Sequence, residues 1–196
     1  LGVNDYGEVI HPNGNQYVKS FTKELFPQWM YEVNGIQLKK TIAMIHGENT
    51  VVVIYDIVKA KKPFKMELLP LMAGRFYHSL QHASEQMHWD ADFDNGTFHN
   101  KPDGMQDVYI NIPGSVYRHE PRWFNNFNCA VEKYRGQDFT EDLFNHGTFT
   151  VQLKKGDSLG IIISTENKNG RDAHALLANE RLRRQYLLDD QPDDDT

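Results

Sequence analysis

Apolar and polar residues alternate over many short stretches of the chain, which indicates short β-strands joined by tight turns. The clearest example is residues 29–38, where alternating positions flank Asn34-Gly35. Asn and Gly tolerate the positive φ angles of a type I′ turn, so this pair predicts a two-residue hairpin. The same dipeptide at residues 13–14, 95–96 and 169–170 predicts further turns of this type.

A second hairpin is expected from residues 41–44 and 50–58, joined by a turn at residues 46–49. The run Val51-Val52-Val53-Ile54-Tyr55 is almost continuously apolar, which predicts a strand that is buried on both faces. Other stretches bounded by turn residues are strand candidates, namely residues 64–71, 88–92, 97–99, 108–112, 116–119, 127–134, 149–153 and 158–165. Strands at this spacing are typical of an antiparallel sandwich or barrel.

Residues 171–188 have a different pattern, with apolar side chains at helical spacing among good helix formers. Asp172 is a candidate N-cap for this helix. We interpret the helix as a connector towards another domain, after a β-sandwich domain over residues 1–170. Residues 189–196 are expected to be a disordered acidic tail.

Composition and charge exclude several functional classes for this chain. A hydrophobic content of 39% with 12% aromatic residues fits a globular protein. The net charge is -6 and no basic cluster is present, so nucleic-acid binding is not expected. No apolar run reaches about 18 residues, so no membrane span is expected. Cys129 is the single cysteine, which excludes an intrachain disulfide and makes a reducing cytoplasm the expected location.

Two patterns suggest metal ligands, but neither is complete. His78 and His82 are four residues apart and on a helix would share a face, yet no third zinc ligand follows at a suitable spacing. The alternating aspartates of residues 90–94 resemble the start of a calcium loop, although the required Gly and Glu are missing from the positions that follow. We therefore predict no metal site and no other cofactor.

Carboxylate pairs alone predict no catalytic residue. Glycoside hydrolysis needs two carboxyl groups across the scissile bond, and Glu132, Glu141, Asp142 and Glu166 are candidates. A chain with 27 acidic residues offers such pairs by chance, however. No nucleophile elbow, P-loop or dinucleotide fingerprint is present.

Aromatic residues that alternate with amides and carboxylates are more suggestive of sugar recognition. The stretches 88–90 and 123–128 have this composition. Trp89 and Trp123 could each contact sugar or another domain, or could belong to the core of the sandwich, while Trp29 is expected in the core.

The order of several segments resembles the N-terminal domain of bacterial and archaeal-type glycogen debranching enzymes. The segments that carry the resemblance are Asn4-Asp5-Tyr6-Gly7, His11-Pro12-Asn13-Gly14, residues 27–35, residues 46–51, Arg75-Phe76-Tyr77-His78, residues 132–138 and Glu141-Asp142-Leu143. The resemblance covers roughly residues 4–188. Members of this family carry additional residues before the position of Asn4, so the sandwich is expected to lack its first strands.

The resemblance implies a mainly β fold, a large antiparallel β-sandwich (a supersandwich, as in the N-terminal domains of glucoamylases and maltose phosphorylases) with a C-terminal connector helix. It also implies an accessory role beside a C-terminal catalytic helical barrel in the same polypeptide. The whole enzyme would remove glycogen branches by glucanotransfer and α-1,6-glucosidase action. The expected partners are α-glucans and that catalytic domain, and an open sheet edge also favours pairing between copies.

On this basis we predict a set of carbohydrate-binding or interdomain residues and no catalytic residue in this chain. The set is Arg75, His78, Trp89, Asp92, Trp123, Asn125, Arg135, Glu141 and Asp142. Two alternatives remain open. This domain could itself carry the 4-α-glucanotransferase activity, or it could be an unrelated β-sandwich binding module.

Overall fold

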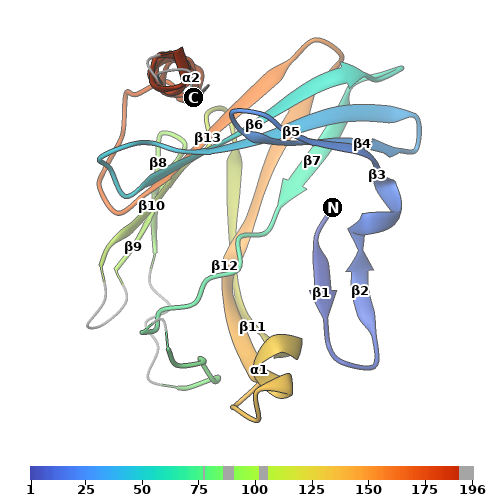
Figure 1. Cartoon of the computed structure of the whole chain (residues 1–196), viewed down its shortest axis with the longest axis vertical. Coiled ribbons are helices and arrows are strands. Elements are labelled where there is room, and N and C mark those ends of the chain that lie inside the picture. The colour runs from blue at the N-terminus through green and yellow to red at the C-terminus, as the bar shows by residue number, and fades with distance from the viewer. Residues whose placement is uncertain (77, 86–90, 102–105, 190–196) are drawn as a thin grey trace, which may run out of the picture.

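The computed structural model describes residues 1–76, 78–85, 91–101 and 106–189 (Figure 1). The strands are β1 (Val3–Asp5), β2 (Ile10–Asn13), β3 (Val18–Lys23), β4 (Pro27–Val33), β5 (Ile36–Met44), β6 (Thr50–Lys59), β7 (Phe64–Leu68), β8 (Asp92–Asp94), β9 (Thr97–Asn100), β10 (Val108–Asn111), β11 (Val116–Asn128), β12 (Thr140–Leu153) and β13 (Ser158–Ser164). The helices are a 3-10 turn, η1 (Gly14–Tyr17), α1 (Ala130–Tyr134) and α2 (Ala173–Asp189). Neither α-helix in these ranges combines the length and the apolar character that a membrane span requires.

Two antiparallel sheets contain eleven of the described strands. Eight of the described strands form the large sheet, in the order β3-β4-β5-β6-β13-β10-β9-β8. Three more form the small sheet, in the order β11-β12-β7, while β1 and β2 form a separate hairpin. In Figure 1 the long strands β11 and β12 run steeply relative to the strands of the large sheet. The expected mainly β, antiparallel fold with a C-terminal helix is therefore confirmed.

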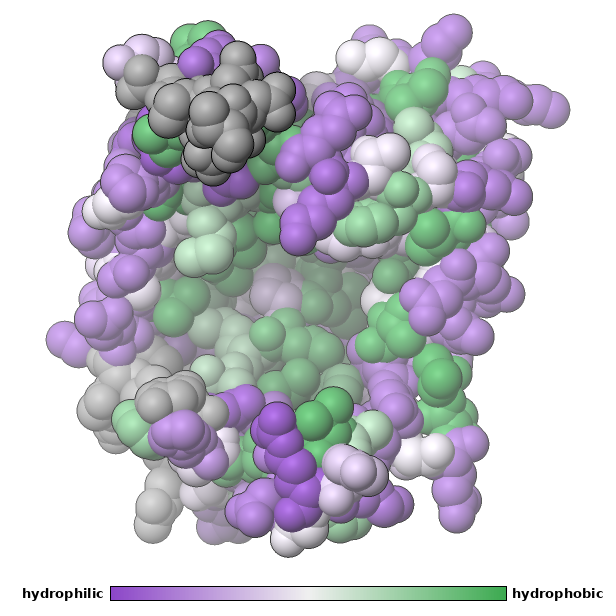
Figure 2. Space-filling view, viewed as in Figure 1, coloured by the Kyte–Doolittle hydropathy of each residue, from purple (hydrophilic) through white to green (hydrophobic). Residues whose placement is uncertain are grey.

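The hydrophobic core lies between the two sheets. Buried side chains from both sheets form one cluster, including Leu38 and Leu159 from the large sheet and Phe149 and Leu153 from the small sheet. We call the face of the large sheet that carries this cluster its inner face. Figure 2 shows that the molecule is hollowed on the side viewed, and that apolar side chains line the hollow. The small sheet thus leaves part of the apolar interior accessible.

The central strand β6 is buried on both faces, as the run of residues 51–55 predicted. Val53 and Ile57 belong to the core between the sheets, whereas Val52 and Ile54 belong to a second cluster on the outer face. That second cluster also contains Ala173 and Leu176 of α2. The helix predicted over residues 171–188 is therefore present, and it covers the outer face of the large sheet (Figure 1).

Helix α2 starts in close contact with β13. A Cβ atom at Gly160 would lie 2.7 Å from the Cβ of Ala173 and 3.0 Å from Cε1 of His174, so only glycine permits this approach. The carboxylate of Asp172 accepts hydrogen bonds from the backbone N–H groups of His174 and Ala175, both at 3.2 Å. These bonds satisfy donors that have no partner within the helix, which is the role of an N-cap.

Further along α2, a buried carboxylate joins the helix to the large sheet. Glu180 is 4% exposed and accepts hydrogen bonds from Arg183, from Arg184 and from the backbone N–H of His46 in the β5–β6 turn. Arg184 also donates to the carbonyl oxygen of Leu25 at 2.6 Å. The hydrogen bond from Arg183 is the largest of the contributions that lower the pKa of Glu180 to about 2.

At Gly147 the paired strands β11 and β12 lie too close together for a Cβ atom. Gly147 pairs with His119, and the register of the β11–β12 ladder shifts between His119 and Arg122. A Cβ atom at Gly147 would lie 2.9 Å from Cε2 of Tyr117 and would overlap the carbonyl oxygen of Arg118. This position therefore requires glycine.

Two of the four predicted Asn-Gly turns are present as type I′ hairpins. Asn34 and Gly35 have φ angles of 50° and 76°, and Asn95 and Gly96 have 47° and 78°. The other two predictions were wrong. Residues 13–14 lie at the change from β2 to the 3-10 turn, and residues 169–170 lie in the loop before α2. Neither pair forms a hairpin, because the strand before it is not paired with an element directly after it.

Several strand predictions differ from the structure. Residues 116–119 and 127–134 were predicted as separate strands, but β11 is continuous across Pro121 and residues 130–134 form α1. Proline is accepted there because β11 is the edge of the small sheet. β12 begins at Thr140, well before the predicted residue 149, and β1, β2 and β3 were not predicted. Most of the predicted strand 88–92 lies outside the described residues.

Candidate functional site

The segment after β7 is held against β12 by backbone and side-chain hydrogen bonds. Met72 and Phe144 form an isolated antiparallel bridge, with N···O distances of 2.8 and 2.9 Å. The buried amide of Asn145 donates to the carbonyl oxygen of Pro70 at 2.8 Å. The loop that follows, residues 73–85 with residue 77 undescribed, is thereby placed beside the end of the small sheet.

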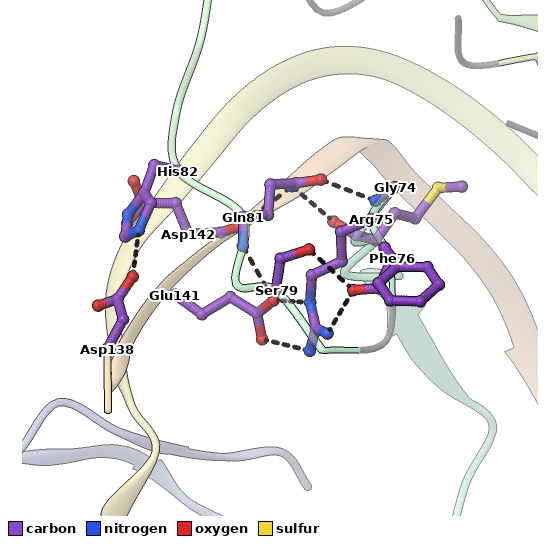
Figure 3. Close-up of polar contacts among 10 residues, drawn as sticks. Gly74, Arg75, Phe76, Ser79, Gln81, His82, Asp138, Glu141 and Asp142 are labelled. Carbon is purple, nitrogen blue, oxygen red and sulfur yellow. Dashed lines mark hydrogen bonds and ion pairs between the residues drawn. The ribbon is translucent and has the colours of Figure 1, made fainter. Parts of the chain in front are cut away.

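Arg75 and Glu141 form the central ion pair of this loop (Figure 3). The Arg75 guanidinium donates through Nε to Oε1 of Glu141 and through Nη2 to Oε2 at 3.3 Å. Glu141 is 8% exposed, and its Oε1 also accepts the backbone N–H of Gln81. A bidentate pair with a buried carboxylate fixes the guanidinium in one orientation.

Gln81 and Asp142 tie the rest of the loop to β12 and β11. The backbone N–H of Asp142 donates to the carbonyl oxygen of Gln81 at 2.7 Å, and the Gln81 side chain accepts from the N–H of Gly74 at 2.7 Å. The carboxylate of Asp142 accepts from the N–H groups of Ala83 and Asn126, both at 2.8 Å. The loop is thus anchored at both of its ends (Figure 3).

A cleft of about 1000 Å³ lies between this loop and α1. Its walls are formed by Arg75 and residues 78–80 on one side, and by residues 129–132, Arg135 and residues 137–138 on the other. The volume is at the upper end of the range of small-molecule sites. Guanidinium, carboxylate, amide and hydroxyl groups in the walls can donate to and accept from the hydroxyls of a polar ligand.

Charged groups that line the cleft are paired with each other or with neighbouring side chains. His82 Nε2 lies 2.9 Å from Asp138 Oδ2, and this hydrogen bond is the main reason that the pKa of Asp138 is lowered. Arg135 donates to Glu132 at 3.1 Å. Burial, and next the charge of Glu141, raises the pKa of the Cys129 thiol, so this cysteine is held in its neutral form. The cleft therefore fits a neutral polar ligand better than an ion.

Two exposed aromatic residues that the sequence analysis did not single out are sequence neighbours of residues that line the cleft. Phe76 is 65% exposed and its ring lies 5.6 Å from that of His78, while Tyr134 at the end of α1 is 92% exposed. Flat apolar rings beside hydrogen-bonding groups suit the faces and hydroxyls of pyranose sugars. The sequence pattern does not reveal which aromatic side chains are exposed, so these two candidate sugar contacts could be found only from the structure.

The structure brings together only some of the predicted site residues. Arg75, His78 and Arg135 line the cleft, and Glu141 holds Arg75 in place. Asp142 binds backbone N–H groups instead of facing the cleft.

The remaining predicted residues lie elsewhere. Trp123 packs edge-on against Phe144, with ring centroids 5.2 Å apart, and Asn125 is exposed on β11. Asp92 lies on β8 at the edge of the large sheet and is not among the described residues that line the cleft. Trp89 lies outside the described residues.

Substitution of Arg75 by methionine is expected to destabilise the domain by about 2 kcal/mol, because the buried carboxylate of Glu141 loses its guanidinium partner. Urea unfolding followed by tryptophan fluorescence measures this difference. Arg118→Met is a matched control, since Arg118 makes an exposed pair with Glu120 and should change stability by about 0.5 kcal/mol or less. Equal effects of the two substitutions would contradict the anchoring role of Arg75.

The cleft lies within a part of the chain that matches a known protein family. A family model described as "Glycogen debranching enzyme N terminal" matches residues 1–160. No curated protein matches the chain. The matched range contains every residue that lines the cleft, whereas α2 lies after it.

Proposed function

Because the chain belongs to the glycogen debranching enzyme N-terminal family, we propose that it is an accessory domain that contacts α-glucan and supports a catalytic domain of the same polypeptide. The substrate class would be glycogen and maltooligosaccharides, and the place of action the cytoplasm. In this proposal the chain binds the glucan and supports the catalytic domain, and the C-terminal catalytic domain cleaves the glycosidic bond.

The observation that carries the proposal is the cleft between the 73–85 loop and α1. Its walls offer the paired polar groups of Arg75, Glu132 and Arg135 to sugar hydroxyls. Phe76 and Tyr134, which neighbour lining residues in the sequence, offer exposed rings to sugar faces. The Arg75–Glu141 pair fixes one wall in advance, so little ordering would be required when a glucan binds.

Calorimetric titration with maltoheptaose and with a branched maltooligosaccharide tests the proposal. Saturable binding is expected, and Tyr134→Ala should weaken it by about 3- to 10-fold through loss of ring contact. Tyr186→Ala is the matched control, because Tyr186 is also an exposed helical tyrosine but lies on α2. Trp123 is a poorer probe, because its contact with Phe144 makes its loss a packing defect.

The results of this titration distinguish an accessory glucan-binding domain from the alternative functions. No binding at millimolar sugar would contradict the glucan-contacting role. Equal weakening by Tyr134→Ala and Tyr186→Ala would contradict the placement of glucan at this cleft. Redistribution of maltoheptaose chain lengths by the protein would instead assign the transferase activity to this domain and overturn the accessory role.

A further inference from the structure

A lysine occupies a position on the inner face of the large sheet where the strand pattern calls for an apolar side chain. Along β5, Leu38 and Ile42 face the core between the sheets, and Lys40 lies between them in the same row. Lys40 pairs with Trp29 on β4 and with Tyr55 on β6, and both of these side chains pack against that core. Neighbouring Lys39 faces the other way and pairs with a carboxylate.

The ammonium group of Lys40 is surrounded by rings instead of by carboxylates. Its Nζ lies 5.8 Å from the ring centroid of Trp29 and 5.9 Å from that of Tyr55. Within the described ranges, no carboxylate lies within salt-bridge distance of it. Desolvation lowers the pKa of Lys40, as expected for a charge that is partly removed from water without an anionic partner.

Lys40 lies at a pocket of about 370 Å³ whose other described walls are mainly apolar. The walls that matter here are Tyr55, Met66, Leu68, Leu69, Leu71 and Phe124. Glu67 is also at the rim, but it alternates with Met66 and Leu68 along β7, is half exposed, and pairs with Lys65 at 3.6 Å. The N-terminal ammonium group of Leu1 also lines the pocket, and burial and the charge of Lys40 lower its pKa. The pocket therefore combines an apolar cavity with positive charge, of which Lys40 is the side-chain source.

We propose that this pocket is a binding site for a small amphipathic carboxylate, whose apolar part contacts the leucine, methionine and phenylalanine walls while its carboxylate pairs with Lys40. Concave, mainly apolar cavities with one or a few fixed polar groups are typical of small-molecule sites. The anion would supply the partner that the partly buried ammonium lacks. This site is separate from the cleft beside α1, so the proposal does not rest on glucan binding.

Titration calorimetry of the full chain with octanoate, and with octanol as its uncharged counterpart, tests the site. Octanoate should bind saturably, and Lys40→Met should weaken it at least 10-fold because methionine keeps the side-chain volume but removes the charge. Octanol should bind both proteins equally weakly. Lys62→Met is the matched control, since Lys62 is exposed in the turn between β6 and β7 and does not line the pocket, and it should leave octanoate binding unchanged.

Thermal unfolding of the same variants without ligand gives a second readout. Lys40→Met should raise the melting temperature, because the partly desolvated charge is replaced by an apolar group. A variant that is more stable yet binds octanoate more weakly would support the site. No octanoate binding at 10 mM or below, equal affinity in wild type and Lys40→Met, or a lower melting temperature for Lys40→Met would each overturn the proposal.

Discussion

Replacement of Gly147 by alanine is expected to destabilise the domain by about 3–5 kcal/mol, a large fraction of the stability of a typical domain. The added Cβ would overlap the carbonyl oxygen of Arg118 and lie 2.9 Å from the Tyr117 ring. Both contacts belong to the neighbouring strand β11, so the β11–β12 ladder would have to separate. Equilibrium unfolding in urea measures the change in the free energy of unfolding.

Gly156→Ala is a suitable control for this experiment. Gly156 has a positive φ of 88° in the β12–β13 turn, but nothing lies within 4 Å of its added Cβ. Alanine there costs only the left-handed backbone conformation, about 1–2 kcal/mol. If Gly147→Ala destabilises the protein no more than Gly156→Ala, the close approach of the two strands does not determine the requirement for glycine.

The second large effect is expected at Glu180. Alanine at this position leaves Arg183 and Arg184 without their carboxylate and the His46 N–H without an acceptor. Removing one partner of a buried pair costs about 3 kcal/mol. For a domain of this size that corresponds to a melting temperature lower by about 6–12 °C. Asn179→Ala, on an exposed position of the same helix, should change stability by about 0.5 kcal/mol or less.

The same carboxylate gives a pH dependence of known sign. The folded state holds the pKa of Glu180 at about 2, below the ordinary value of 4.5. Its contribution to stability is therefore complete above pH 4.5 and is lost as the pH falls towards 2. The stability difference between wild type and Glu180→Ala should shrink over this interval. A difference that stays constant from pH 7 to about pH 2.5 would show that the Glu180 charge does not hold α2 in place.

The elements predicted correctly are those whose local pattern and tertiary environment agree. The β4–β5 hairpin follows from Asn34-Gly35, and the double burial of β6 follows from its continuous apolar run. β11 could not be predicted as one strand, because Pro121 interrupts its pattern and only its edge position makes proline acceptable. The start of β12 carries the buried polar residues Glu141 and Asn145, which hydrogen-bond with Arg75 and Pro70 from a distant part of the sequence.

The candidate cleft was harder to predict than the fold. Arg75 and Arg135 could be singled out from the resemblance, but the pairing of Arg75 with Glu141 joins residues far apart in the sequence. Phe76 and Tyr134 look like ordinary core aromatics in the sequence, and only their exposure distinguishes them. Trp123 has the composition expected of a sugar contact, yet it packs against Phe144.

The pairing of β6 with β13 has a consequence for synthesis of the protein. β6 ends at Lys59 and β13 begins at Ser158, so the middle of the large sheet closes only after residues 60–157 have been made. At roughly 5–20 residues per second on the ribosome, this delay is on the order of 5–20 s. During that time the nascent β3–β6 meander would present the apolar edge of β6 to other chains. This edge of β6 is therefore covered by its own chain only after β13 has been made.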